Sequence, residues 1–159
     1  MANTPSDALM HQAKSQPEGT AFVFHQQVWT YRRLADEAER VARGLAAAGV
    51  KAGCRVALHM MNRPEMLIAY FACLRLGAIA APLRTAFKFA ELAPMLQRLA
   101  PALYIGESDL YRNVAAVDAG ILPRERPVEC PGRPRLGLRH WRCEPQETRE
   151  HPAKEPPGV

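Results

Sequence analysis

The alternation of strand-like and helix-like segments between residues 55 and 117 is the feature that most constrains the fold. Short runs of apolar, β-prone residues occupy 55–60, 78–83 and 102–105, and each is followed by a longer segment whose apolar side chains recur at helical spacing. Strands separated by helices pair in parallel, because a parallel pair needs a long crossover connection. The sequence therefore predicts an α/β fold built on a parallel sheet.

The helical segments carry recognisable boundaries. The first places its apolar side chains on one face, with Thr30 as its N-cap and Gly49 in the left-handed position at its end. The second is apolar nearly all round, which indicates burial on more than one side, and Asn62 is its expected N-cap. Helices are predicted over residues 32–48, 63–76, 89–99 and 109–117.

Composition divides the chain into three parts. Residues 1–20 are polar and predict a loose lead-in, whereas two runs of aromatic and β-branched residues, 21–24 and 28–31, predict a β-hairpin. Residues 129–159 are rich in Pro and Arg, and their few apolar side chains would not offset about 1–2 kcal/mol of ordering entropy per residue. We expect a folded domain over 21–128, followed by an unstructured, disordered tail that packs on nothing.

Two explanations of the tail stay open. Residues 131–159 contain six prolines, five arginines and three glycines. Off-frame translation of a GC-rich gene is biased towards these residues, because their codons are GC-rich, so the tail is either frame-shifted or a genuine divergent segment.

Charge and apolar content exclude some classes of protein. The formal net charge is +5 and the pI about 9.3, but Lys and Arg are spread along the chain without a basic run, so nucleic-acid binding is not expected. No apolar stretch reaches the roughly 18 residues that a membrane span needs, and no signal-peptide core is present. The four cysteines form no C-x-x-C pair, which predicts reduced thiols in a cytoplasmic protein.

Four stretches within roughly residues 16–117 carry a resemblance in both order and spacing. They are Thr-Tyr-x-x-Leu at 30–34, Gly-Leu with Gly-Val-x-x-Gly-x-Arg-Val at 44–56, Asn-x-x-Glu at 62–65, and Phe-Ala-x-x-x-x-Gly-Ala with a later Pro at 71–82. Together they resemble the start of the AMP-dependent synthetase/ligase superfamily of adenylate-forming enzymes, acyl-CoA synthetases in particular. Cys54 stands where the family usually has Asp, and Arg84 where it often has Asn.

The resemblance implies an incomplete parallel-sheet N-terminal subdomain of an AMP-forming acid–CoA ligase for fatty or aromatic acids. The intact relative would use ATP, Mg and CoA to join a carboxylic acid to CoA and release pyrophosphate. The Ser/Thr/Gly-rich phosphate loop, the acidic motif for magnesium and the catalytic lysine of the family are not recognisable in these 159 residues. The resemblance places them beyond residue 159, so we predict that this chain alone is inactive and binds none of these cofactors.

Arg84 and Lys88 are the candidate cofactor-binding residues, and no catalytic or metal-ligating residue is predicted. Both follow the apolar run 78–83, at the carboxyl edge where open α/β sheets bind ligands. In some relatives a basic residue of this segment reaches a phosphate of CoA, and the resemblance implies that role here. The alternative is a pair of solvated surface cations. His59, within a predicted strand, is expected to be a satisfied or exposed side chain rather than a base.

A second hypothesis treats the chain as a non-catalytic interaction module. A fragment of a larger sheet leaves an unpaired edge and an uncovered apolar face. Such a surface would support self-association or docking on a full-length ligase.

Overall fold

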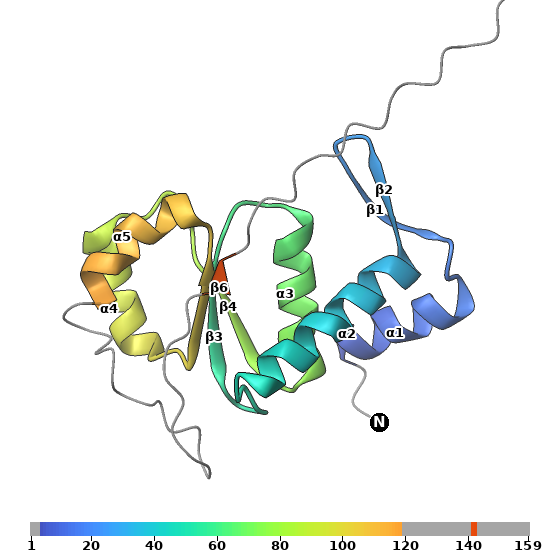
Figure 1. Cartoon of the computed structure of the whole chain (residues 1–159), viewed down its shortest axis with the longest axis horizontal. Helices are drawn as coiled ribbons and strands as arrows, with labels where there is room; N and C mark the ends of the chain where they lie inside the picture. Colours follow the sequence, from blue (N-terminus) through green and yellow to red (C-terminus); the bar gives the residue numbers. More distant parts are fainter. Residues whose placement is uncertain (1–3, 119–140, 143–159) are drawn as a thin grey trace, which may run out of the picture.

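The computed structural model of the chain describes residues 4–118 and 141–142, which form a hairpin and a parallel α/β sheet (Figure 1). In chain order the elements are α1 (Pro5–Ser15), β1 (Thr20–Phe24), β2 (Gln27–Thr30), α2 (Tyr31–Ala47), β3 (Arg55–His59), α3 (Pro64–Arg75), β4 (Ile79–Pro82), α4 (Phe89–Leu99), β5 (Leu103–Gly106), α5 (Ser108–Asp118) and β6 (Trp141–Arg142). The predicted α/β class is confirmed.

The main sheet has the strand order β4-β3-β5-β6, and the recorded pairs are parallel. Strand β3 is central: Val56 lies opposite Ala80 on one side and opposite Leu103 on the other. Because β3 and β5 are parallel, their carboxyl ends lie at the same edge of the sheet. The parallel sheet expected from the alternation of strands and helices is therefore present.

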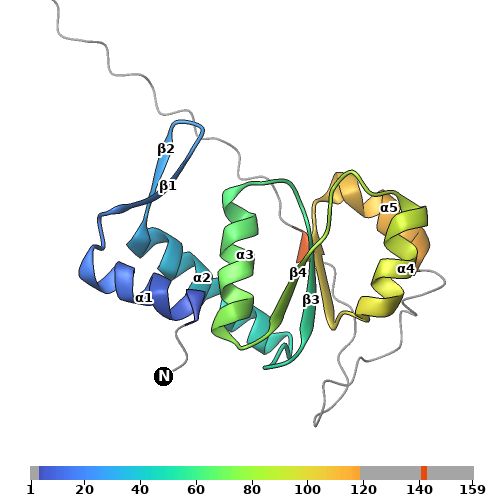
Figure 2. The same ribbon diagram turned by 180° about the vertical axis from the view of Figure 1, so that it is seen from behind.

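Side-chain alternation along β3 divides the core into two layers. Val56 and Leu58 pack in a cluster with residues of α1, α2 and α3, whereas Ala57 packs with residues of α4, β5 and α5. Figures 1 and 2 show the same division, with α1–α3 on one face of the sheet and α4 and α5 on the other. A parallel sheet covered on both faces needs apolar residues in successive positions, which explains the continuous apolar run of β3.

The boundaries of α2 agree with those predicted from the sequence, whereas the N-cap of α3 differs from the predicted one. Thr30 caps α2, its Oγ1 accepting the Arg33 N–H at 3.2 Å, and Gly49 takes a φ of 88° after the helix. The N-cap of α3 is Arg63 rather than Asn62, and Arg63 makes no side-chain capping bond. Pro64 opens the helix, and a proline keeps the residue before it extended, which moves the boundary to Arg63.

The expectation of a loose lead-in over residues 1–20 is wrong, because α1 occupies Pro5–Ser15. Thr4 and Asp7 form a reciprocal cap: the Asp7 N–H donates to Thr4 Oγ1 at 3.1 Å, and the Thr4 N–H donates to Asp7 Oδ2 at 3.0 Å. Leu9 is buried in the cluster that contains α2 and α3 residues. The reciprocal cap and the packing of Leu9, Met10 and Ala13 on this cluster stabilise the helix, although its composition is largely polar.

The predicted hairpin is confirmed, and it stands apart from the main sheet (Figure 1). Strands β1 and β2 pair antiparallel, with Val23 opposite Val28. The rings of Phe22 and Trp29 stack with centroids 5.4 Å apart, and the Arg33 guanidinium lies 3.8 Å from the Trp29 ring centroid. This aromatic and cationic stack joins the hairpin to α2.

Two expectations about the later residues and the cysteines need correction. The backbone of β6 pairs with β5, so the segment after residue 128 contacts the sheet at Trp141 and Arg142; the rest of that segment lies outside the described residues. Cys54 is disulfide-bonded, and Cys73 is free and buried. The expectation of reduced thiols is wrong at Cys54, because the spacing of cysteines in the sequence does not reveal which of them form disulfides in the fold.

Over the ranges 4–118 and 141–142, no helix is long and apolar enough to cross a membrane.

Candidate functional site

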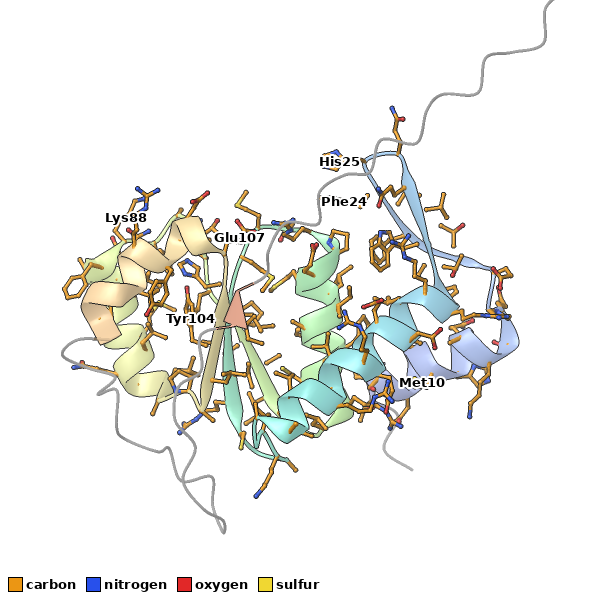
Figure 3. The ribbon with its side chains drawn as sticks, viewed as in Figure 1. Met10, Phe24, His25, Lys88, Tyr104 and Glu107 are labelled. Carbon is orange, nitrogen blue, oxygen red and sulfur yellow. The ribbon has the colours of Figure 1, made fainter. Side chains whose placement is uncertain are left out.

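Polar side chains gather at the carboxyl edge of the main sheet, where β3 and β5 end. His59 and Gly106 are register partners at the ends of these strands, and Glu107 follows directly. Figure 3 shows Lys88 and Glu107 along this edge, with Tyr104 deeper, between the sheet and the helices α4 and α5. We call His59, Tyr104, Gly106 and Glu107 the edge cluster.

A buried imidazole–phenol pair lies at the centre of the edge cluster. His59 Nδ1 and the Tyr104 hydroxyl are 2.7 Å apart, and the two residues are 0% and 5% exposed. Burial lowers the pKa of His59, although the Arg84 backbone and the Glu107 charge oppose that effect, and burial raises the pKa of Tyr104. Both groups are therefore neutral at physiological pH.

Half of the His59 ring is unsatisfied. Its Nε2 atom is buried and makes no hydrogen bond of ordinary geometry, although the Arg84 backbone lies near enough to raise the pKa of the ring. A buried polar atom without a hydrogen-bond partner lowers the stability of the folded state by about 1–3 kcal/mol. An apolar residue at this position would not have that cost. The expectation of a satisfied or exposed histidine holds in part, since the side chain is fully buried and one of its two ring nitrogens is hydrogen-bonded.

Glycine at position 106 makes room for the Tyr104 ring. A Cβ atom at this position would lie 2.6 Å from the Tyr104 hydroxyl oxygen and 2.7 Å from a ring carbon. Residues i and i+2 of a strand share a face, so the ring folds across the glycine to reach His59. Gly106 is thus a condition for the histidine–tyrosine bond.

Glu107 ties the loop after β3 to β5. Its N–H donates to the His59 carbonyl oxygen at 3.1 Å, and its Oε1 accepts the Met61 N–H at 2.9 Å. The same carboxylate lies 3.5 Å from Arg63, whose Nε also donates to Glu65 at 2.8 Å. Burial alone would lower the pKa of Arg63. The carboxylates of Glu65 and Glu107 have the larger effect and raise it. The β3–α3 loop is therefore fixed by charge-assisted bonds.

The two predicted residues, Arg84 and Lys88, lie between β4 and α4 and are exposed. The Arg84 carbonyl accepts the Phe87 N–H at 3.1 Å, which closes a turn, and the Arg84 guanidinium lies 5.5 Å from the Phe87 ring centroid. Lys88 is the N-cap of α4, and its N–H donates to Glu91 at 2.9 Å. Within the described ranges neither side chain forms an ion pair, so both cations face solvent.

Other reactive groups of the described part do not assemble a second site. Burial raises the pKa of Cys73 to about 12, so this thiol packs as a small apolar side chain. Among residues 4–118 and 141–142, no cluster of three or more His, Cys, Asp or Glu side chains could hold a metal ion.

Sequence reasoning found the edge but missed the edge cluster. It named Arg84 and Lys88 from their place after a strand. Tyr104 belongs to the predicted strand 102–105 without a role of its own, and Gly106 and Glu107 are not singled out by the sequence. Period-two alternation could have placed Tyr104 and Gly106 on one face of β5. No pattern in the sequence indicates the contact between Tyr104 and His59, because the two residues lie 45 positions apart.

Comparison with known proteins identifies the family. Residues 9–156 match the family model described as AMP-binding enzyme. The chain belongs to the AMP-binding enzyme family. The match reaches residue 156, beyond the limit of 117 that the sequence motifs supported.

Acid–CoA ligases are among the curated relatives. The chain is 35% identical over 115 residues to the feruloyl-CoA synthase of Amycolatopsis sp, covering 72% of this chain and 23% of the relative. It is 29% identical over 119 residues to the medium-chain fatty-acid–CoA ligase of Escherichia coli (strain K12), covering 74% of this chain and 21% of the relative. The chain thus spans less than a quarter of the length of these two relatives.

A solved structure has the same fold. The O-succinylbenzoate coenzyme A synthetase of Bacillus subtilis, in complex with AMP, matches with a TM-score of 0.61 and 32% identity. The match covers 64% of this chain and 26% of that protein. The sheet and helices described above are therefore the N-terminal arrangement of an adenylate-forming ligase, as the resemblance implied.

Gly106→Ala tests whether the glycine makes room for the tyrosine. We expect it to lower the free energy of unfolding by about 1–3 kcal/mol, the usual cost of overpacking. In a Tyr104→Ala background the same substitution should cost close to nothing, because the clashing ring is gone. Urea unfolding of the four proteins measures both costs. Equal costs in the two backgrounds would show that the ring contact is unimportant.

Proposed function

We propose that this chain is the N-terminal portion of an AMP-forming acid–CoA ligase for a fatty or aromatic acid, and that these 159 residues alone do not turn over. The observation that carries the proposal is the coverage: 72% of this chain aligns with the feruloyl-CoA synthase, of which it spans only 23%. The relatives named above act on one aromatic and one fatty acid, which supports the proposed acid class.

The proposed reaction has two steps. A carboxylate oxygen of the acid attacks the α-phosphorus of ATP, and the bond to pyrophosphate breaks. The sulfur of CoA then attacks the acyl carbon, its thiol proton is lost, and AMP leaves. Both steps depend on offsetting phosphate charge in the transition state.

The residues of this chain do not fit the ATP phosphates or magnesium. No two of its ten glycines fall close together with Ser, Thr and Lys, so the backbone cradle that phosphate loops use is not recognisable. The described residues also offer no cluster of acids for a metal ion. We assign no catalytic step to this chain.

Arg84 and Lys88 suit a different task, which is to contact a phosphate of CoA. Both cations are exposed at the carboxyl edge of the sheet and carry no ion pair among the described residues. The Arg84–Phe87 turn and the α4 N-cap hold them on adjacent, ordered backbone. A guanidinium and an ammonium so placed match phosphate oxygens in charge and hydrogen bonding.

The absence of turnover can be measured directly. Purified chain is incubated with ATP, Mg²⁺, CoA and a panel of fatty and aromatic acids, and pyrophosphate release is followed. We expect a rate equal to that of buffer, because no phosphate-binding loop is recognisable in the sequence. A full-length acid–CoA ligase under the same conditions is the positive control. Release above buffer would refute the proposal of inactivity.

The role of the two cations can be tested by NMR with millimolar CoA, since an exposed ion pair contributes at most about 1 kcal/mol. We expect the amide signals of residues 84–88 to shift with CoA and not with pantetheine, which has no phosphate. Arg84→Ala and Lys88→Ala should each reduce the shifts by about half or more. Arg98→Ala removes an exposed cation from the last turn of α4 and should leave the shifts unchanged. If all variants show equal shifts, CoA contacts residues other than Arg84 and Lys88.

One observation favours the alternative of an interaction module that docks on a full-length ligase or self-associates. Strand β4 is the edge of the main sheet, and its Ile79 is 52% exposed. An exposed edge strand with an apolar side chain is a site for strand pairing. A monomer in size-exclusion chromatography that also retains no ligase would contradict this alternative.

A further inference from the structure

The strands β4 and β5, which pair with the two sides of β3, differ in how their outer edges are protected from further strand pairing. Along β4, the Ile79 and Leu83 N–H groups donate to carbonyl oxygens on the β3 side at 2.8 Å each. Successive residues of a strand direct their backbone groups to opposite sides, so Ala80 and Pro82 face the outer edge. Proline has no N–H, and in an outward position it weakens the addition of a further strand.

Strand β5 carries neither a proline nor a charged residue, and its four residues are buried. The Ala102 N–H, just before the strand, donates to the Arg55 carbonyl oxygen at 2.7 Å, which directs Ala102 towards β3. By the same alternation, Leu103 and Ile105 direct their backbone groups to the other side. An uncharged apolar strand with such an outer edge pairs readily with a strand of another chain.

The outer edge of β5 is covered by β6, a two-residue strand from later in the chain (Figure 1). Ile105 lies opposite Trp141, and Gly106 lies opposite Arg142, in parallel register. β6 therefore occupies the position at which an added strand would pair with the outward-facing Ile105. It is shorter than most strands, which have about 3–10 residues, and β3 pairs with β4 and β5 without it.

We propose that β6 is an edge cap: by pairing with β5, it keeps a second copy of this chain from adding its own β5 at the same edge. The second copy is the partner because two uncovered copies of one strand edge are complementary about a two-fold axis. No charged side chain of β5 opposes their approach, although the whole chain carries a net charge of +5. The proposal goes beyond the ligase function and requires no ligand.

Hydrogen exchange of the full chain, followed by NMR, tests the cap in the unmodified protein. Ala80 and Ile105 both direct their amides to the outer side of their strands, and β6 covers the second of them. We expect the Ile105 amide to exchange slowly and the Ala80 amide rapidly. Rapid exchange at both positions would overturn the proposal, because the outer edge of β5 would then be open.

A proline variant of the full chain removes the cap. Trp141→Pro with Arg142→Pro eliminates both backbone N–H groups of β6. Trp141→Val with Arg142→Val is the matched control, because it replaces the same side chains and keeps both N–H groups. Sedimentation velocity from micromolar to millimolar concentration measures association. We expect the proline variant to double its mass as the concentration rises, and the valine variant and the wild type to remain monomers.

Exchange in the proline variant identifies the surface that associates. The Ile105 amide should lose its protection in the monomer and regain it in the dimer, whereas a dimer that protects Ala80 instead would place association on β4 and contradict the proposal. A monomeric proline variant, or a wild type that dimerises at the same concentrations, would also overturn it. So would loss of the native signals of α2 and β3 in the proline variant, because β6 would then stabilise the fold rather than cover its edge.

Discussion

The structure depends on the burial of β3 on both faces. Its side chains alternate between two apolar layers, so the strand joins the layer of α1–α3 to the layer of α4 and α5. A parallel sheet of this kind has no solvent-facing side, and polar groups can enter it only at the strand ends. The position of the edge cluster follows from that constraint: His59 is the last residue of β3, and Glu107 is the first after β5.

Local patterns in the sequence predicted those parts of the fold that depend on residues close together in the chain. Helix periods, the Thr30 cap and the left-handed Gly49 each depend on residues within a few positions, and the structure confirms them. The failures were of two kinds. Helix α1 was missed because its polar face dominates its composition, although Thr4 and Asp7 cap it reciprocally. The N-cap of α3 was misplaced by one residue because the constraint from Pro64 was not applied.

Sequence reasoning met a different limit at the site. The place of Arg84 and Lys88 followed from a topological rule about strand ends. The bond between His59 and Tyr104 did not, because it depends on which strands are neighbours and on the depth of each side chain. The same holds for Glu107, whose partners lie across the sheet edge on another loop. Non-local polar contacts of this kind require the assembled fold, whereas family membership required only the order and spacing of short segments.

The glycine at the end of β5 has an evolutionary consequence. The Tyr104 ring can cross the strand only where position 106 lacks a Cβ atom, and the imidazole at position 59 is bonded only while that ring is in place. The contacts therefore predict that the three positions change together. A sequence that keeps the tyrosine but places any other residue at position 106 would bring a Cβ atom into the space of the Tyr104 ring, so the glycine has to be present whenever the ring lies across the strand.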